Sequence, residues 1–149
     1  MIESNKIKRS ILKFSSNDNC PCGSLIKYKK CCKPFHEDIK IPINALELMK
    51  SRYCAYAVGK SEYIIFTTHQ KNNDFNTNTK AWNKDILDFS QNTIFEKLEI
   101  IEFIDGLTES FVTFKANITQ NKQDVSFIEK SRFVKENERW LYIDGQFIE

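Results

Sequence analysis

The sequence contains little of what loop-rich, membrane-spanning or secreted proteins need. Only four glycines and three prolines occur among its 149 residues, which argues against a loop-rich scaffold. No apolar run approaches the roughly 20 residues that cross a bilayer. The N-terminal stretch has neither an apolar core nor the small-residue cleavage site of a secretory signal. We therefore expect no membrane insertion and a cytoplasmic protein, in a compartment where thiols stay reduced.

The chain also lacks the short motifs of common catalytic sites. It has no G-x-S-x-G, no Walker loop and no H-E-x-x-H. His69, Asp144 and Glu62 are candidates for general acid-base chemistry, but His69 follows a helical stretch and Asp144 precedes a glycine in a predicted turn. We expect Arg52 and Arg132 to pair with carboxylates. The sequence alone therefore assigns no catalytic residue.

Composition and charge indicate one globular core with a basic N-terminal end. The chain is 41% hydrophobic and 28% charged, and its length suits one domain with a small appendage. The net charge is +2, yet residues 1–60 carry 12 basic and 5 acidic residues whereas residues 61–149 carry 10 and 15. A basic end of this kind is typical of a docking surface for polyanions, and an evenly solvated face would give the same count.

Four of the five cysteines fall within 13 residues, as Cys20, Cys22, Cys31 and Cys32. In a reducing compartment two close pairs of thiols indicate a metal site rather than disulfides. The spacing C-x-C-x8-C-C supplies the four soft ligands of a structural zinc ion, and iron is the second choice because it also binds thiolates. Cys54 stands alone inside a helical pattern, so we expect a small buried side chain there.

Two questions about this metal site stay open at the level of sequence. His36 follows Cys32 by four positions, and its imidazole is an acceptable replacement for one thiolate. Four thiolates around a zinc ion carry a net charge of about −2, which nearby cations must offset. Four lysines surround the second cysteine pair and either stabilise the thiolates or contact RNA or an acidic protein: Lys27, Lys29, Lys30 and Lys33.

The cysteine segment resembles a known module. The stretches Cys20-Pro-Cys-Gly-Ser and Lys27-Tyr-Lys-Lys-Cys-Cys look like the SEC-C motif, the zinc-binding module at the C-terminus of the preprotein-translocase ATPase SecA. Leu25 and Ile26 stand where a Gly-Lys pair is common. In that ATPase the module is associated with binding a chaperone and the ribosome, so the resemblance implies an interaction role.

Three helices are predicted between the cysteine segment and residue 93. Apolar residues recur at helical spacing over 42–58, and Ser61 is placed to cap a short second helix that runs through Phe66. An i, i+4, i+7 pattern that begins at Trp82 indicates a third helix of about three turns.

From residue 93 onward the apolar period changes to two. Residues 111–118 and 127–134 alternate between apolar and polar side chains, as half-buried strands do. Four antiparallel strands therefore follow the three helices, in an α+β layout with the helices packed on one face of a curved sheet. The turns are expected at three places: Asp105-Gly106, 120–123 and 135–138.

The larger region also resembles a family. Leu48-Met-Lys-Ser-Arg-Tyr-Cys-Ala-Tyr, Ser131-Arg-Phe-Val and Trp140-Leu-Tyr-Ile-Asp-Gly look like the YchJ family of uncharacterised bacterial proteins. The resemblance implies a SEC-C module fused to a cone-shaped domain similar to nuclear transport factor 2. The expected organisation has three parts: a basic N-terminal extension over 1–19, a zinc-binding module over 20–40 and the α+β domain over 41–149.

Two functions from different classes fit these expectations. The first is a cytoplasmic zinc-binding adaptor whose lysines dock on a partner such as the ribosome or the protein-export and chaperone machinery. The second is a small-molecule binder or enzyme that uses a pocket in the α+β domain, with zinc purely structural. Sequence-specific DNA binding is not expected, because the basic segment has no recognition helix of useful length. Five aromatic residues are candidates for either core or pocket lining: Tyr53, Trp82, Phe133, Trp140 and Tyr142.

Overall fold

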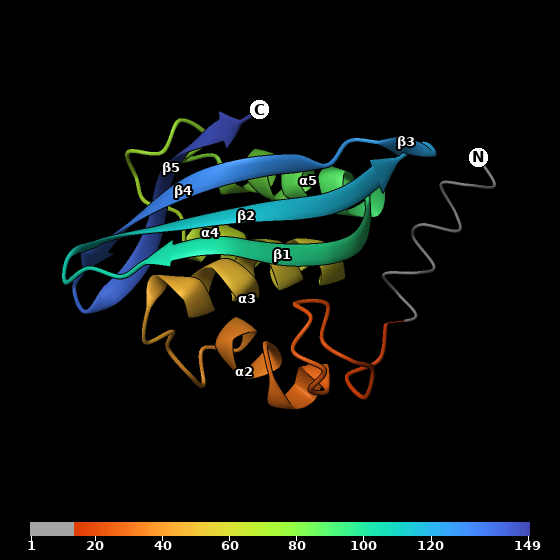
Figure 1. Cartoon of the computed structure of the whole chain (residues 1–149), viewed down its shortest axis with the longest axis horizontal. Helices are drawn as coiled ribbons and strands as arrows, with labels where there is room; N and C mark the ends of the chain where they lie inside the picture. The colour runs from red at the N-terminus through yellow and green to blue at the C-terminus, as the bar shows by residue number, and fades with distance from the viewer. Residues whose placement is uncertain (1–13) are drawn as a thin grey trace.

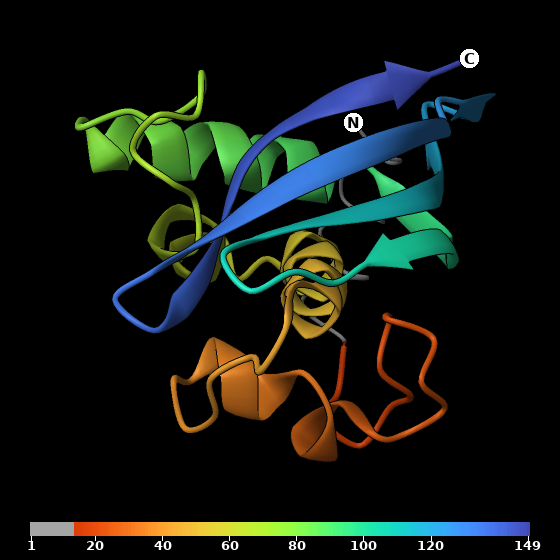
Figure 2. The same ribbon diagram turned by 60° about the vertical axis from the view of Figure 1, so that its left-hand side comes forward.

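The computed structural model describes residues 14–149, in which one curved antiparallel sheet is covered by helices (Figure 1). The N-terminal segment with the cysteines lies against α3 (Ala45–Val58), on the side away from the sheet, as Figure 2 also shows. This arrangement confirms the predicted α+β class. Most of the predicted extension, residues 1–13, lies outside the described residues. No helix in residues 14–149 is both long and apolar enough to span a bilayer.

The elements follow the predicted order. Besides α3, the helical segments are η1, a 3-10 turn over Tyr28–Lys30, α2 over Lys33–His36, α4 over Ser61–Phe66 and α5 over Thr79–Gln91. The strands are β1 (Ile94–Ile104), β2 (Glu109–Gln120), β3 (Gln123–Asp124), β4 (Phe127–Glu136) and β5 (Arg139–Ile148). The sheet order is β1-β2-β4-β5, with the two-residue β3 paired to β2 as one strand more than the predicted four.

Helix α3 is the central element, because it is buried from two sides. It begins after Asn44, whose side chain accepts from the Glu47 backbone N–H at 2.9 Å, and it ends at Gly59 in the left-handed region with φ 77°. The cap sets the start three residues later than the predicted 42–58. Ser51 and Cys54 are fully buried in addition to the predicted apolar face. A helix packed between a sheet and a second segment needs small or apolar residues around most of its circumference.

The sheet places its alternating side chains against the helices. In β2, Val112, Phe114, Ala116 and Ile118 are all buried, as the period of two predicts. In β4 the largest buried side chain is Phe133, which is 1% exposed. These strands and the inner faces of α3, α4 and α5 form the main core.

Two local predictions were wrong for reasons of tertiary context. Ser61 is the first residue of α4 and makes no cap; its hydroxyl donates to Asn83 on α5. Asp144 does not begin a turn, because β5 continues through Gly145 and pairs Asp144 opposite Arg132. There Arg132 donates to both carboxylate oxygens of Asp144, at 2.9 and 2.7 Å. This pairing with a carboxylate agrees with the expectation for Arg132.

Candidate metal centre

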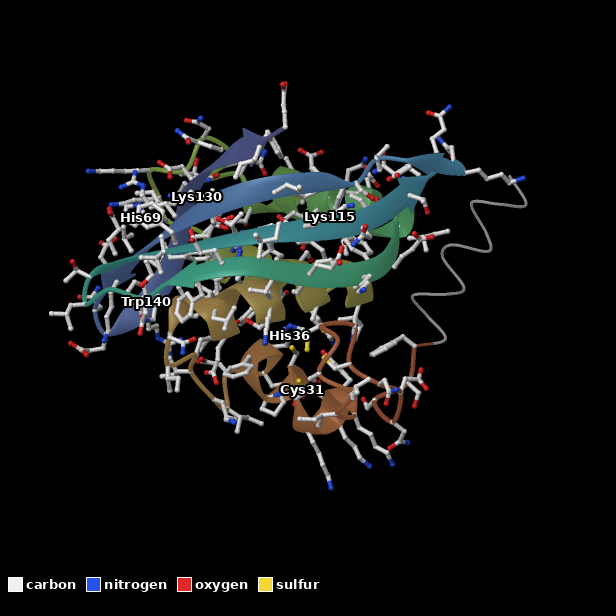
Figure 3. The ribbon with its side chains drawn as sticks, viewed as in Figure 1. Cys31, His36, His69, Lys115, Lys130 and Trp140 are labelled. Carbon is white, nitrogen blue, oxygen red and sulfur yellow. The ribbon has the colours of Figure 1, made fainter. Side chains whose placement is uncertain are left out.

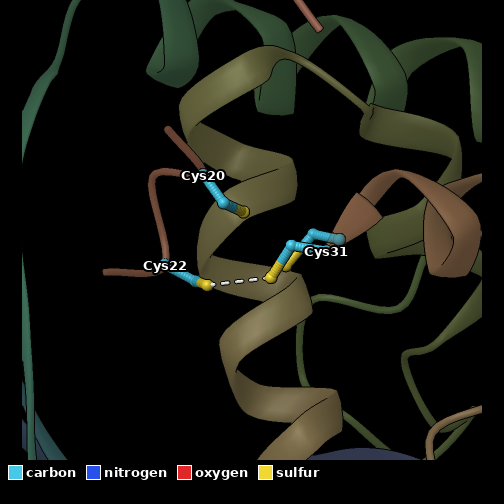
Figure 4. Close-up of side chains that lie close together, drawn as sticks. Cys20, Cys22 and Cys31 are labelled. Atoms are coloured by element: carbon cyan, nitrogen blue, oxygen red, sulfur yellow. Dashed lines mark hydrogen bonds between the residues drawn. The ribbon is translucent and has the colours of Figure 1, made fainter. Parts of the chain in front are cut away.

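The four clustered cysteines converge on one point. The Sγ atoms of Cys20, Cys22, Cys31 and Cys32 all lie within 4.8 Å of one another, and the Cys22 and Cys31 sulfurs are 3.6 Å apart (Figure 4). Three of these side chains are buried and Cys31 is half-buried. The fold therefore brings together the same four thiols that the sequence spacing predicts as ligands.

The local backbone explains how so short a segment closes around one point. The Cys20 carbonyl accepts from the Gly23 N–H at 3.1 Å, and Gly23 adopts a φ of 87° that favours glycine. The Cys20 N–H donates to the Ile26 carbonyl at 2.8 Å, and this hydrogen bond closes the loop between the two cysteine pairs. Tyr28 begins η1, the helical turn before the second pair, and no side chain caps its start. The Ser24 hydroxyl accepts from the Ile26 N–H at 3.1 Å.

The donor set fits a tetrahedral metal ion. With a zinc–sulfur bond of about 2.3 Å, tetrahedral geometry separates neighbouring sulfurs by about 3.8 Å. The separations in the cluster, at most 4.8 Å and 3.6 Å for Cys22 and Cys31, match this requirement. Hydrogen bonds from the neighbouring thiols of Cys22, Cys32 and Cys54 lower the pKa of Cys20, whereas burial raises the pKa of Cys31 to about 11. A divalent ion would replace the protons that these sulfurs share, because it binds cysteines as thiolates.

Cys54 contributes a fifth sulfur beside the cluster. It is fully buried, as predicted, but its Sγ lies 3.6 Å from the Cys20 Sγ and it projects from α3. It lies outside the group of four that surrounds one point. Sequence reasoning missed this contact, because Cys54 is 22 positions beyond Cys32 and no spacing links them.

His36 is engaged elsewhere. Its Nδ1 accepts from the Tyr28 hydroxyl at 2.7 Å, and its Nε2 donates to the Ser51 carbonyl of α3 at 2.8 Å. Burial lowers the pKa of His36, which favours the neutral ring that this pattern needs. Because both ring nitrogens have partners, His36 joins the cysteine segment to α3, and Figure 3 shows it between Cys31 and that helix. The geometry thus favours four cysteines over a set that includes His36.

The lysines that the sequence singles out lie around the cluster, but not in one environment. Lys27, Lys29 and Lys30 are exposed, and no carboxylate in residues 14–149 lies within 4.0 Å of their ammonium groups. Lys33 is half-buried and donates to the Ser16 hydroxyl at 3.3 Å. Three of the four side chains are therefore available to a partner.

Exposed apolar side chains accompany the lysines. Leu25 is 82% exposed and Ile26 is 49% exposed, directly before Lys27. Leu25 also adopts a φ of 67°, a left-handed conformation that costs a residue with a Cβ roughly 1 kcal/mol. A large side chain thus stands fully in solvent at a position where glycine would be less strained.

The acid-base candidates do not share a site. His69 is not stabilised by a helix end, because α4 ends at Phe66; its ring pairs with Glu136 of β4, and its Nδ1 accepts from the Lys71 N–H at 3.0 Å. None of His69, Asp144 and Glu62 lines the large cavity of the α+β domain. The aromatic candidates belong to the core or pack against it, and all of them except Trp140 also line this cavity: Tyr53, Trp82, Phe133, Trp140 and Tyr142.

Two family models match the chain. Residues 17–34 match the SEC-C motif, and residues 44–145 match the middle, NTF2-like domain of YchJ. The chain belongs to the YchJ-like family. Both resemblances drawn from the sequence are confirmed, and the matches cover the cysteine segment as well as the helices and sheet of the YchJ-like domain.

Curated relatives and solved structures agree with this assignment. A UPF0225 protein of Yersinia pestis is 35% identical over 130 residues, which cover 85% of this chain and 81% of that protein. A SEC-C motif protein from Rhodopseudomonas palustris superposes with a TM-score of 0.77 at 26% identity, over 89% of this chain and 100% of that one. A SEC-C motif protein from Psychrobacter arcticus superposes with a TM-score of 0.74 at 25% identity, over 90% of this chain and 85% of that one. The YchJ-like chain therefore shares both the module and the domain with its relatives.

Proposed function

We propose that this YchJ-like protein is a cytoplasmic adaptor that holds one zinc ion in its four-cysteine cluster and docks through the surrounding lysines on the ribosome. The observation that carries the proposal is the convergence of four sulfurs within 4.8 Å of one another, in the same short segment that carries three exposed lysines. Metal and docking surface belong to one short segment, so the ion would order the surface that the partner contacts.

The choice of zinc follows from the donor set. Four thiolates at tetrahedral spacing form a closed site with no open position for water, which suits a structural ion rather than a catalytic one. Iron binds similar sites and is the alternative metal. Residues outside the ligand set hold the segment in place. Gly23 and the backbone of Cys20 shape the loop, and His36 and Cys54 connect the segment to α3.

The docking surface is defined by Lys27, Lys29, Lys30 and Lys33 and suits a polyanion. Cationic side chains that lack protein carboxylate partners gain most from contact with phosphates, and such contacts release counterions and weaken with salt. The helical segments that carry these lysines have three and four residues, too short to read a DNA groove. The adjacent exposed Leu25 and Ile26 would add apolar contact to this electrostatic attraction. A chaperone or export component with an acidic surface is the second type of partner that this chemistry suits.

Charge reversal of two lysines tests the docking surface. In co-sedimentation with ribosomes, we expect the zinc-loaded protein to bind at about 50 mM salt and to lose most binding by about 200 mM. The double substitution Lys29→Glu and Lys30→Glu should weaken binding by at least about tenfold, because two phosphate contacts become repulsions. Lys71→Glu with Lys80→Glu makes the same charge change at two exposed lysines of the α+β domain and should leave binding unchanged.

Zinc content of the same variants separates the two roles of the lysines. We expect both double variants to retain one zinc per chain. If the wild type fails to bind ribosomes at low salt, or if Lys29→Glu with Lys30→Glu loses its zinc, the lysines serve to offset the thiolate charge and the docking proposal is wrong.

A further inference from the structure

The α+β domain contains a cavity, open to solvent on one side, that the adaptor function does not use. It has a volume of about 570 Å³ and lies between α3, α5 and the inner face of β2, β4 and β5. This volume is within the range of small-molecule sites. Ten of its twenty lining residues are aromatic, so most of the wall is apolar and the few polar groups decide which ligand fits.

Arg52 is the buried cation on the helical wall of the cavity. It is only 8% exposed, and its Nη1 donates to the Ile64 carbonyl at 3.1 Å and to the hydroxyls of Thr67 and Thr68 at 2.7 and 3.1 Å. Its guanidinium lies over the Tyr142 ring, 4.8 Å from the ring centroid. The expectation that Arg52 pairs with a carboxylate was wrong: its partners in residues 14–149 are neutral oxygens and an aromatic face.

A buried cation without a counter-charge is costly. Taking a guanidinium out of water is strongly unfavourable unless an anion or a full set of acceptors compensates it. Nη1 is satisfied by three acceptors, whereas no acceptor in residues 14–149 binds Nε or Nη2 of Arg52. Arg52 therefore presents the N–H donors that bind a carboxylate in the bidentate manner.

Glu129 is the carboxylate on the sheet wall of the cavity. Its Oε2 accepts from the Tyr142 hydroxyl at 3.1 Å and from the Ser131 hydroxyl. Gly145 on β5 makes room for it, since a Cβ there would lie 2.5 Å from the same oxygen. Tyr142 thus stands between the two charges, with its ring on Arg52 and its hydroxyl on Glu129. The other carboxylate oxygen accepts no hydrogen bond within residues 14–149 and suits a ligand donor.

We propose that this cavity binds a small amphoteric molecule, with a carboxylate that pairs with Arg52, an aromatic or apolar body, and an N–H or O–H group that donates to Glu129. The remaining lining carboxylates, Asp74 and Asp85, are exposed to solvent. Solvated charges contribute little, so they do not turn the cavity into a cation site. This site is independent of the zinc adaptor function.

Three related probes test which charge the cavity selects: indole-3-acetate, its neutral amide and tryptamine. Binding is measured by calorimetry with the full zinc-loaded chain. We expect indole-3-acetate to bind at least about tenfold more tightly than the other two probes, because one charge-assisted hydrogen-bonded pair contributes about that much affinity. Arg52→Gln should remove this preference, and Arg52→Lys should retain part of it. If tryptamine binds more tightly, or if none of the probes binds at about 10 mM, the proposal is wrong.

A second variant protects the test against loss of folding. Ala116 lines the cavity, so Ala116→Leu should fill part of it and weaken indole-3-acetate without touching Arg52. Glu129→Gln removes the charge but keeps an acceptor, and should preserve the preference for the carboxylate. Unchanged binding of indole-3-acetate in both Arg52→Gln and Ala116→Leu would place the probe outside the cavity and overturn the inference.

Discussion

Replacing Cys31 with serine should abolish metal binding and unfold the cysteine segment while the sheet stays folded. Structural zinc in small thiolate sites contributes about 10–16 kcal/mol of binding free energy, and a serine hydroxyl is a poor substitute ligand. The segment has few other attachments, whereas the main core draws almost all of its residues from α3 to β5. We expect elemental analysis to show loss of one metal per chain, and amide spectra to show collapse of signals from residues 14–32 only.

Cys54 supplies the matched control. Cys54→Ala removes a fully buried thiol that contacts Cys20 but lies outside the group of four, so it should retain one metal per chain. The same elemental analysis distinguishes zinc from iron. Full metal content in Cys31→Ser, or loss of the metal in Cys54→Ala, would contradict the assignment of ligands.

Replacing Phe35 with alanine should destabilise the whole chain rather than the module alone. Phe35 belongs to α2, next to the cysteine segment, yet it is 9% exposed and packs in the main core with residues such as Leu48 and Trp140. Truncation of a buried phenylalanine costs about 3–5 kcal/mol. Urea unfolding followed by circular dichroism should therefore show one transition with a lower midpoint.

Leu107, which is 92% exposed, serves as the control for this substitution. Leu107→Ala should change the free energy of unfolding by no more than about 0.5 kcal/mol. An unfolding curve of Phe35→Ala that matches the wild type would mean that α2 adds nothing to the stability of the larger domain. That result would support the independence of the two parts that the sequence divides at residue 40.

Elements with a strong local period were predictable from the sequence. The alternation in β2 follows the prediction because one face of the strand packs on the core, and α4 ends at Phe66 as predicted. β5 was harder to predict, because the pair Asp144-Gly145 looks like a turn when read alone. Within the sheet, Arg132 holds Asp144 by two hydrogen bonds, and the missing side chain of Gly145 accommodates Glu129. Neither neighbour is visible in the local sequence.

The candidate sites show the same division between local and distant information. The four cysteines were found because their ligand geometry is set within 13 residues. The sequence could not decide whether His36 or a fourth cysteine completes the ligand set. The group that hydrogen-bonds the His36 Nε2 is the Ser51 carbonyl on α3, which is distant in sequence. Cys54 and Arg52 were assigned ordinary structural roles, and only tertiary packing places one beside the cluster and the other on a cavity wall.

The central claim is that one zinc ion held by four cysteines orders the basic segment. X-ray absorption at the zinc edge of the purified protein tests it most directly, since the scattering shell reports the ligand type and distance. We predict four sulfur atoms at about 2.3 Å and no nitrogen. A shell that contains an imidazole nitrogen, or fewer than four sulfurs, would contradict the four-cysteine centre and restore His36 as a ligand.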